Sequence, residues 1–476
     1  MNSAVAVGVY VSVVLVLGLL ARRRSSRSPE EYFLAGRGLG TLVLFMALFG
    51  TNATSFVLVG IPARAYTDGI AVFGLNAPIV ALGIPLSFWA IGAPARRMAQ
   101  RLGALSPAEL YAKRFDSRAV GWTFFAFFTL YTTPYMVQAV KGAAEALYVD
   151  SEGGVPRWAG GLGVVLLSLV YTSLGGMRAT AWTNVFQGGL FLFFMVAVFF
   201  LVSGELGGLG PAMEAVRAHD EALLVRGQSG LYSGGGWFSW GLTISLTVIA
   251  FPHMLTRLMA GRGDAELKSV SRLYPPALLL LWLPAVLLGV WGAAALPGLA
   301  RPDQVMGSMS GAHLPGWMGP LAFLAVLAAV MSTLDAQLLT LSSMLVRDVL
   351  PAGGAASASG VRVGQGFALL VAAVVYLLAQ VWGDSVFDIS RKAFEGYTTL
   401  TPALLLGVRW KRFTAAGAIA SILAGNAVLG LAWAGHWPRT ELLPVFWALV
   451  VGSLAAVLVS WLTPPRPEAT ARAFGE

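Results

Sequence analysis

The stretch "LAAVMSTLDAQLLTLSSMLVRD", residues 327–348, decides the fold class and raises the first functional question. It continues an apolar run that begins near Leu321, yet it carries Ser332, Thr333 and Asp335 close together. Polar and ionisable side chains are costly in a bilayer, so they usually face a bundle interior, a partner or a water-filled cavity. If this run crosses a membrane, its three polar side chains indicate an internal polar site.

The composition of the whole chain is typical of a membrane protein. Of its 476 residues, 57% are hydrophobic and 12% are charged, whereas about a quarter of the residues in soluble domains are charged. Its mean hydropathy is +0.72. The absence of cysteine excludes a disulfide framework and thiol-based metal sites. We predict an all-α polytopic membrane protein whose residues 1–476 form a single membrane domain.

The apolar runs predict about thirteen membrane-spanning helices, because each run is long enough to cross a bilayer. Their ranges are roughly 3–20, 41–63, 71–93, 119–147, 158–174, 181–203, 237–256, 273–296, 318–346, 363–383, 393–408, 413–434 and 441–462. The first run has its positive charges after the apolar stretch, which favours a retained helix over a secretory signal.

The basic residues separate to one side when the intervening loops are assigned alternately to the two sides of the membrane. Positively charged short loops stay in the cytoplasm, so we expect the N-terminus outside and the C-terminus inside. This distribution also explains the net charge of +9 without a nucleic-acid partner. The residues on the basic side are Arg22, Arg23, Arg24, Arg27, Arg37, Arg96, Arg97, Arg101, Lys113, Arg114, Arg118, Arg257, Arg262, Lys268, Arg272, Arg409, Lys411 and Arg412.

Two predicted spans contain residues that disfavour a continuous helix. "GTNATS" at 50–55 and "FPH" at 251–253 lie at membrane depth, and a proline removes a helical hydrogen bond. Non-helical backbone is tolerated there only where it is buried or lines a cavity. Two interrupted spans in corresponding halves of a chain are typical of a transporter binding site. The span at 41–63 opens one set of five helices, and the span at 237–256 opens a second. Because each set has an odd number of spans, the second set is expected to run inverted.

Three motifs resemble the signature regions of the sodium/solute symporter family, which includes proline, pantothenate, sialic acid, monocarboxylate and sugar symporters. They are "EYFLAGRGLG" (31–40), "YTSLGGMRATAWTNVFQG" (171–188) and "AAVMSTLDAQLL" (328–339). The resemblance runs from about Glu31 to about Trp410.

The resemblance implies the five-plus-five inverted repeat of the leucine-transporter type. The expected divisions are 1–37 as an extra helix and cytoplasmic loop, 38–203 as the first repeat, 237–410 as the second repeat, and 411–476 as two further helices and a tail. The small-residue segment 351–360 is expected to be a cytoplasmic linker.

The resemblance also implies a sodium site between the first broken helix and the eighth core helix. The backbone carbonyls of Gly50, Ala53 and Ala329 and the hydroxyls of Ser332 and Thr333 would bind the ion. The residues at 329, 332 and 333 share one helix face, and oxygen ligands suit a hard cation. The alternative is local: serine and threonine in a helix often bond back to the carbonyl one turn earlier.

Three positions depart from the common family pattern. Asn184 stands where many members have an acid that supports a second cation in some of them, so a second sodium ion is not expected. Ala336 lacks the hydroxyl that some members have. Asn52 stands where amino-acid transporters such as proline carriers can have an aspartate, which weakens a proline assignment.

The substrate site is expected beside the sodium ion, near the middle of the membrane. Its candidate residues are Asn52, Thr54, Ser55, Gln138, Phe251 and His253. For two of them another role is open, because Gln138 could bridge two helices and His253 could satisfy backbone groups freed by the proline.

Two charged residues inside predicted spans are candidates for a role in coupling. Lys141 has Glu145 four residues later, so a neutralising pair is favoured. A lysine left free would instead suit a carboxylate substrate. Asp335 could form a hydrogen bond or salt bridge within the bundle, or take part in ion coupling.

We therefore predict sodium-coupled symport of a small organic solute, an organic acid or an amino-acid-like compound, into the cell by alternating access. The sodium gradient and membrane potential would drive it, and a monomer would suffice. The expected location is a bacterial inner (plasma) membrane, with the lipid bilayer, the sodium ion and the substrate as partners. The alternative is a proton-coupled or sodium-independent carrier with Asp335 as the protonatable group.

Two other classes are disfavoured. An enzyme is not expected, because the four histidines lack metal-ligand spacing. A sensor fused to a signalling module is not expected either, because the tail after Trp461 is short. The histidines are His219, His253, His313 and His436.

Overall fold

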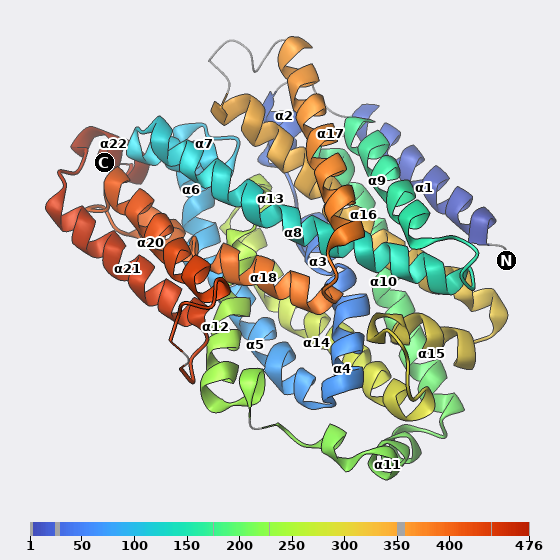
Figure 1. The fold of residues 1–476 in the computed structure, drawn as a ribbon. Helices are drawn as coiled ribbons and strands as arrows, with labels where there is room; N and C mark the ends of the chain where they lie inside the picture. The colour runs from blue at the N-terminus through green and yellow to red at the C-terminus, as the bar shows by residue number, and fades with distance from the viewer. Residues whose placement is uncertain are drawn as a thin grey trace.

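The computed structural model describes residues 3–23, 29–174, 176–227, 229–349, 358–438 and 440–475 (Figure 1). The described residues are predominantly helical, and their one isolated β-bridge joins Leu39 to Gly261. The predicted all-α class is confirmed. Arg24, Arg27 and residues 351–357 of the expected linker lie outside the described residues.

The helices follow one another with short connections. The α-helices are α1 (Ser3–Arg23), α2 (Pro29–Leu34), α3 (Thr41–Asn52), α4 (Ile61–Asp68), α5 (Ala71–Ser87), α6 (Ala93–Leu102), α7 (Pro107–Phe115), α8 (Arg118–Asp150), α9 (Arg157–Leu174), α10 (Met177–Glu205), α11 (Leu209–His219), α12 (Gly234–Ala250), α13 (Pro252–Ala260), α14 (Asp264–Ala295), α15 (Val305–His313), α16 (Gly319–Met344), α17 (Ala358–Val381), α18 (Val386–Thr398), α19 (Thr401–Arg409), α20 (Ala415–Trp433), α21 (Pro444–Leu462) and α22 (Pro467–Phe474). Three π-helical segments continue α-helices: η2 (Phe56–Gly60), η3 (Phe88–Gly92) and η8 (Leu345–Val349). Five short 3₁₀ turns are η1 (Ala35–Arg37), η4 (Glu221–Leu224), η5 (Gly230–Tyr232), η6 (Pro302–Gln304) and η7 (Gly316–Met318).

Within the described residues, seven helices are long and apolar enough to cross a membrane, and up to nine if each of two bent pairs forms one span. The chain is a multi-pass membrane protein. A helix or helix pair lies at each predicted span, but the total of about thirteen crossings stays a prediction. The seven are Ala71–Leu102, Met177–Glu205, Asp264–Ala295, Gly316–Asp348, Arg362–Val381, Ala415–Trp433 and Pro444–Leu462.

Both predicted helix breaks are present. The chain bends by 53° between α3 and the segment Phe56–Asp68, and by 57° between α12 and α13. At the first bend Ala53 has an extended conformation, with φ −80° and ψ 96°. At the second bend Phe251 is extended and Pro252 begins the new helix, where a proline needs no hydrogen-bond acceptor.

A further interruption, which the sequence did not predict, separates α18 from α19. The first of these helices ends at Thr398 and the second begins at Thr401. The Thr398 hydroxyl lies 2.7 Å from the carbonyl oxygen of Phe394. Thr399 Oγ1 lies 2.7 Å from the carbonyl oxygen of Gly396, and both are local bonds of the kind that bend helices.

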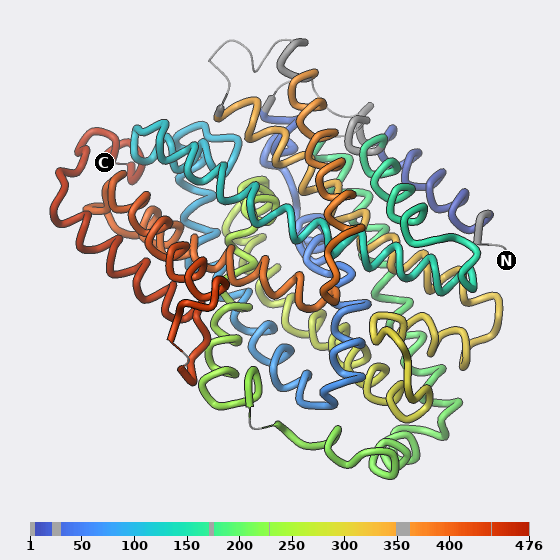
Figure 2. Tube along the Cα trace, viewed as in Figure 1, coloured from blue at the N-terminus to red at the C-terminus, as the bar shows by residue number. Residues whose placement is uncertain are grey.

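α16 is the central helix of the molecule. It packs against α3, α8, α10 and α13, and 78% of its most apolar stretch is buried, compared with 28% for α17. The polar residues of α16 therefore face protein rather than lipid. At opposite edges of the bundle lie α1 and the pair α20–α21, as the ribbon and the chain trace show (Figures 1 and 2).

Candidate functional site

The hydroxyls of α16 meet the broken end of α3. Ser332 Oγ lies 2.7 Å from the carbonyl oxygen of Gly50 and 2.8 Å from that of Ala329. Thr333 Oγ1 lies 3.0 Å from the carbonyl oxygens of both Thr51 and Ala329. Four of the residues implied by the family motif thus come together, and Thr51, which no motif singled out, joins them.

The local bonding that was considered as an alternative is also present. Each hydroxyl reaches Ala329 one turn earlier on α16 and, at a similar distance, a carbonyl of α3. A serine that only satisfied its own helix would not need the second partner. The arrangement therefore adds an interhelical contact to the local one, at the point where α3 ends.

Ala53, the remaining implied residue, lies at the break itself. Its N–H donates to the carbonyl of Phe49 at 3.0 Å, which closes the last turn of α3. Its own conformation is extended and its side chain is buried. The donor set around Ser332 and Thr333 consists of neutral oxygen atoms, which is the chemistry that a hard monovalent cation requires.

Gly50 permits the close approach of α3 to α10. A Cβ atom at this position would lie 3.2 Å from the backbone oxygen of Asn184 and 3.7 Å from the Cα of Gly188. A larger residue would move α3 away from α10.

A small cavity of about 20 Å³ lies at the first break. Of the six substrate candidates, only Asn52 lines it. Ala53, a predicted sodium ligand, lines it as well. The sequence did not indicate the walls from α5, α8, α12, α14 and α18, which include Val80, Ile84, Tyr135, Thr247, Trp282 and Phe394.

Gln138 joins α8 to the broken segment. Its Nε2 donates to Thr54 Oγ1 at 3.2 Å, and its Oε1 accepts a hydrogen bond from Ser55 Oγ at 2.7 Å. All three side chains are buried. Their polar atoms are thus paired with one another, which is the helix-bridging role that the sequence left open for Gln138.

Phe251 and His253 lie beside the same region at the second break. The ring centroid of Tyr135 is 4.8 Å from that of Phe251, and the rings of Phe251 and His253 are 5.3 Å apart. Both His253 nitrogens are buried and have no hydrogen-bond partner within the part of the chain that the structure describes. Tyr135 therefore connects the second break to the cavity at the first.

The expected pair of Lys141 with Glu145 is not formed. Lys141 Nζ donates to the carbonyl oxygens of Trp382 and Asp384 at 2.7 and 2.6 Å. Glu145 accepts two hydrogen bonds from Arg157, at 2.6 and 2.9 Å. The guanidinium fork matches both carboxylate oxygens, a geometry that an ammonium group does not offer.

Lys141 and Glu145 line a cavity of about 570 Å³ at the end of the bundle near α15 and the start of α18. Asp303, in the connection between α14 and α15, also lines it. Burial raises the pKa of Asp303 to about 6, although its Oδ2 accepts a hydrogen bond from the Val386 N–H at 3.3 Å.

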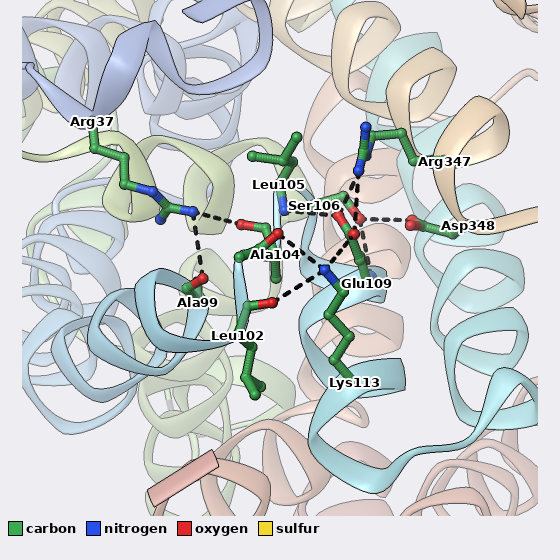
Figure 3. Close-up of polar contacts among 11 residues, drawn as sticks. Arg37, Ala99, Leu102, Ala104, Leu105, Ser106, Glu109, Lys113, Arg347 and Asp348 are labelled. Carbon is green, nitrogen blue, oxygen red and sulfur yellow. Dashed lines mark hydrogen bonds and ion pairs between the residues drawn. The ribbon is translucent and has the colours of Figure 1, made fainter. Parts of the chain in front are cut away.

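At the opposite end of the bundle, hydrogen bonds and ion pairs join several helices and loops. Two backbone hydrogen bonds join the segment before α3 to the end of α13, from Leu39 N to Ala260 O and from Arg262 N to Leu39 O. The Arg37 guanidinium donates to Glu30 at 2.8 Å and to the carbonyls of Ala104 at 2.8 Å and Ala99 at 3.4 Å, the latter two drawn in Figure 3.

A second set of contacts at this end joins α7 and the residue before it to η8, which continues α16 (Figure 3). Lys113 and Arg347 lie 2.9 and 3.3 Å from Glu109. The Ser106 hydroxyl donates to Asp348 at 2.7 Å. Burial alone would raise the pKa of Glu109, but Lys113, the Leu105 N–H and Arg347 together hold that pKa below its usual value.

Asp335 is buried on α16, within electrostatic range of Tyr10 on α1. The structural and the coupling roles considered for it both remain predictions.

Comparison with known proteins adds independent information. A model of the sodium:solute symporter family matches residues 32–425. Sodium/proline symporters of Staphylococcus aureus, among them those of strains JH9 and NCTC 8325 / PS 47, are 25% identical over 482 residues, which cover 96% of this chain and 91% of theirs.

Two solved structures have a similar fold. A Na⁺-coupled sialic acid symporter in its substrate-bound outward-open state matches with a TM-score of 0.80 and 18% identity, over 97% of this chain and 98% of that one. Mhp1, a nucleobase-cation-symport-1 family transporter in a closed conformation with bromovinylhydantoin bound, matches with a TM-score of 0.62 and 15% identity, over 92% of this chain and 97% of that one.

Proposed function

The chain belongs to the sodium:solute symporter family, and from this premise we propose that it uses the sodium gradient to carry a small organic solute into the cell by alternating access. The family and the relatives are symporters, so the chain is a transporter and not an enzyme. The observation that carries the proposal is the contact of the Ser332 and Thr333 hydroxyls with the carbonyls of Gly50 and Thr51 at the end of α3.

The coupling ion is a sodium ion held between α3 and α16. Its ligands are the carbonyl oxygens of Gly50, Ala53 and Ala329 and the hydroxyl oxygens of Ser332 and Thr333. The observed contacts support this set. The hydroxyls of Ser332 and Thr333 donate to carbonyls in this structure, and their oxygen lone pairs can turn toward a cation that binds between the two helices. A neutral set of ligands binds the ion without a buried carboxylate, and this favours its release inside the cell.

The architecture is the five-plus-five inverted repeat, with residues 38–203 and 237–410 as the two repeats within about thirteen spans. The two bent helix pairs, with angles of 53° and 57°, support this division because each opens one repeat. In the proposed orientation, the arginine-rich end faces the cytoplasm of a bacterial cell and the N-terminus lies outside.

The structure corresponds to an outward-facing arrangement in this proposal. The contacts of Arg37 and Glu109 close the cytoplasmic end, whereas the cavity of about 570 Å³ opens at the other end. Phe387 lines that large cavity and Phe56 lines the small one at the break, and their rings stack at 5.5 Å. In this proposal the ring pair is the barrier between the two cavities, and its movement connects them.

The substrate is a small organic acid or an amino-acid-like solute, bound at the break beside the ion. Asn52 supplies an amide to the small cavity, and Tyr135, Phe251 and Phe394 supply aromatic surface near it. Thr54, Ser55, Gln138 and His253 support the walls. Proline and sialic acid, named for the relatives, both carry a carboxylate.

Sodium-dependent thermal stability tests the proposal. A ligand that binds only the folded state raises the melting temperature by mass action. We expect sodium chloride, titrated against potassium chloride at constant ionic strength, to raise the melting temperature of the purified protein. Ser332→Ala/Thr333→Ala should abolish this rise.

Ser342→Ala is the matched control, because the Ser342 hydroxyl on the same helix bonds only to the Leu338 carbonyl in the described contacts. It should keep the sodium effect. Wild-type protein whose stability and uptake respond equally to sodium and potassium would refute the sodium coupling. It would favour the alternative of a proton-coupled carrier, for which Asp335→Asn is the next variant.

A further inference from the structure

A buried arginine lies on the second broken helix, close to the candidate sodium site. Arg257 belongs to α13 and its residue surface is 1% exposed. A permanent charge within a membrane-spanning segment is costly, and such residues usually face the bundle interior and serve a function. α13 packs against both α3 and α16, the two helices that form the candidate site.

The guanidinium of Arg257 is bound by Asn184 of α10. A guanidinium has only donors, so the side-chain atom of Asn184 that lies 2.7 Å from Arg257 Nη2 is its oxygen. In this orientation the amide nitrogen of Asn184 lies 3.1 Å from both Gln187 Oε1 and the carbonyl oxygen of Thr180, which accept its hydrogen bonds.

The same contacts lead to the ion site through Thr51. Thr51 Oγ1 lies 3.0 Å from the Asn184 oxygen and 2.7 Å from the carbonyl oxygen of Ala47, and its single proton can go to either. The carbonyl of Thr51 accepts the hydrogen bond of Thr333. The side chain of Asn184 and the side chain and carbonyl of Thr51 thus link the positive charge to the hydroxyl of Thr333.

We propose that the Arg257 guanidinium is a fixed cation of the coupling machinery. Bound by Asn184, it lies in the cluster of polar side chains next to the candidate sodium site that Thr51, Thr180 and Asn184 form. The transporter therefore binds one sodium ion. The inference rests on the proposed function. The guanidinium takes up the amide oxygen of Asn184, and its charge repels any further cation from the oxygens of Thr51 and Thr180. Arg257 is a positioning residue, since it acts on sodium through these neighbours.

The number and affinity of bound sodium ions test this proposal. We expect purified wild-type protein to bind one radioactive sodium ion per molecule. Arg257→Gln should bind sodium on the order of tenfold more tightly, because one like charge is removed from a partly shielded site. Arg257→Lys, which keeps the charge, should retain the wild-type affinity. Arg257→Gln/Asn184→Asp should bind a second ion.

Several results would overturn the inference. Two sodium ions per wild-type molecule would do so, as would equal losses of affinity in Arg257→Gln and Arg257→Lys, which indicate a structural role. If Arg257→Gln does not fold, Arg257→Met keeps a side chain of similar length without the charge and should still bind sodium more tightly than wild type. An absence of sodium binding in the wild type would refute the proposed function itself, which separates the two failures.

Discussion

At the scale of single residues, the structure gives several polar side chains partners from distant parts of the chain. The hydroxyls of Ser332 and Thr333 each lie within hydrogen-bond distance of a carbonyl of their own helix and of a carbonyl 282 residues away. Ser55 and Gln138 are separated by 83 residues. In a membrane-embedded core, such pairs remove the cost of an unsatisfied polar group while holding two helices in register.

Gln138→Ala should destabilise the protein by about 1–3 kcal/mol, because Ser55 and Thr54 lose their side-chain partner while they remain buried. Thermal denaturation in detergent would measure this loss. Gln100→Ala, at an exposed position on α6, is the control and should leave the melting temperature nearly unchanged. Equal melting temperatures for both variants would contradict the bridging role.

Asp303→Asn should stabilise the protein at pH 7.5 but not at pH 4. Burial raises the pKa of this carboxyl to about 6, so its ionisation disfavours the folded state. The penalty is absent below the pKa of the unfolded chain, near 4, grows between about pH 4 and 6, and is complete above this range. Partial exposure reduces the expected gain to about 1–2 kcal/mol.

Melting temperatures of wild type and Asp303→Asn from pH 4 to 8 would measure this effect. Asp116→Asn, at an exposed carboxylate at the other end of the bundle, is the control. A gain that is independent of pH would show that burial of the Asp303 charge is not its cause.

At the scale of secondary-structure elements, the first broken helix depends on close packing against α8. A Cβ atom on Gly142 would lie 2.3 Å from Cβ of Ser55, which is closer than atoms can approach without movement. The break is therefore held by two features of α8: the hydrogen bonds of Gln138 and the missing side chain of Gly142, one turn further along the same helix.

Gly142→Ala should displace the broken segment and lower stability by about 1–3 kcal/mol, the usual cost of overpacking. Ser55 lies two residues after Ala53, a proposed sodium ligand, so movement of this segment would displace the site. The variant should therefore also weaken the sodium-dependent rise in melting temperature. Gly163→Ala on α9 is the control, since nothing lies within 4 Å of a Cβ atom there. A normal sodium response in Gly142→Ala would show that the site tolerates movement of this segment.

At the scale of the whole molecule, the two ends of the bundle differ in how tightly they are closed. Arg37, in η1 ahead of α3, contacts α2, α6 and the loop that follows it, and the end of α13. Arg37 is also the last of three successive residues with positive φ, after Ala35 and Gly36. Two of the three are not glycine, so the contacts of Arg37 help hold an otherwise strained segment.

Arg37→Ala should shift the transporter toward a state that is open at this end. The natural chain has no cysteine, so Asn52→Cys provides a single label position in the small cavity. In inside-out vesicles, we expect a membrane-impermeant maleimide to label Arg37→Ala/Asn52→Cys faster than Asn52→Cys alone. Arg101→Ala, an arginine at the same end that binds only the carbonyl of Phe474 in the described contacts, is the control. Unchanged labelling in Arg37→Ala would contradict the closing role of these contacts.

The sequence by itself determined the helical class, the membrane location and the positions of two broken helices. It also predicted the shared face of Ala329, Ser332 and Thr333. These features follow from local information: hydropathy over one helix length, proline and glycine within a span, and the spacing of residues on a single helix. The family motifs added that this face meets Gly50.

Only the tertiary structure decided which distant side chains become partners. It brought Thr51 beside Thr333, bound Gln138 to Ser55, and gave Lys141 and Glu145 separate partners instead of each other. It also bound Arg257 to Asn184, although the sequence counted Arg257 among the basic loop residues. Hydropathy and spacing describe one helix at a time, whereas these contacts depend on how helices far apart in the chain cross within the bundle.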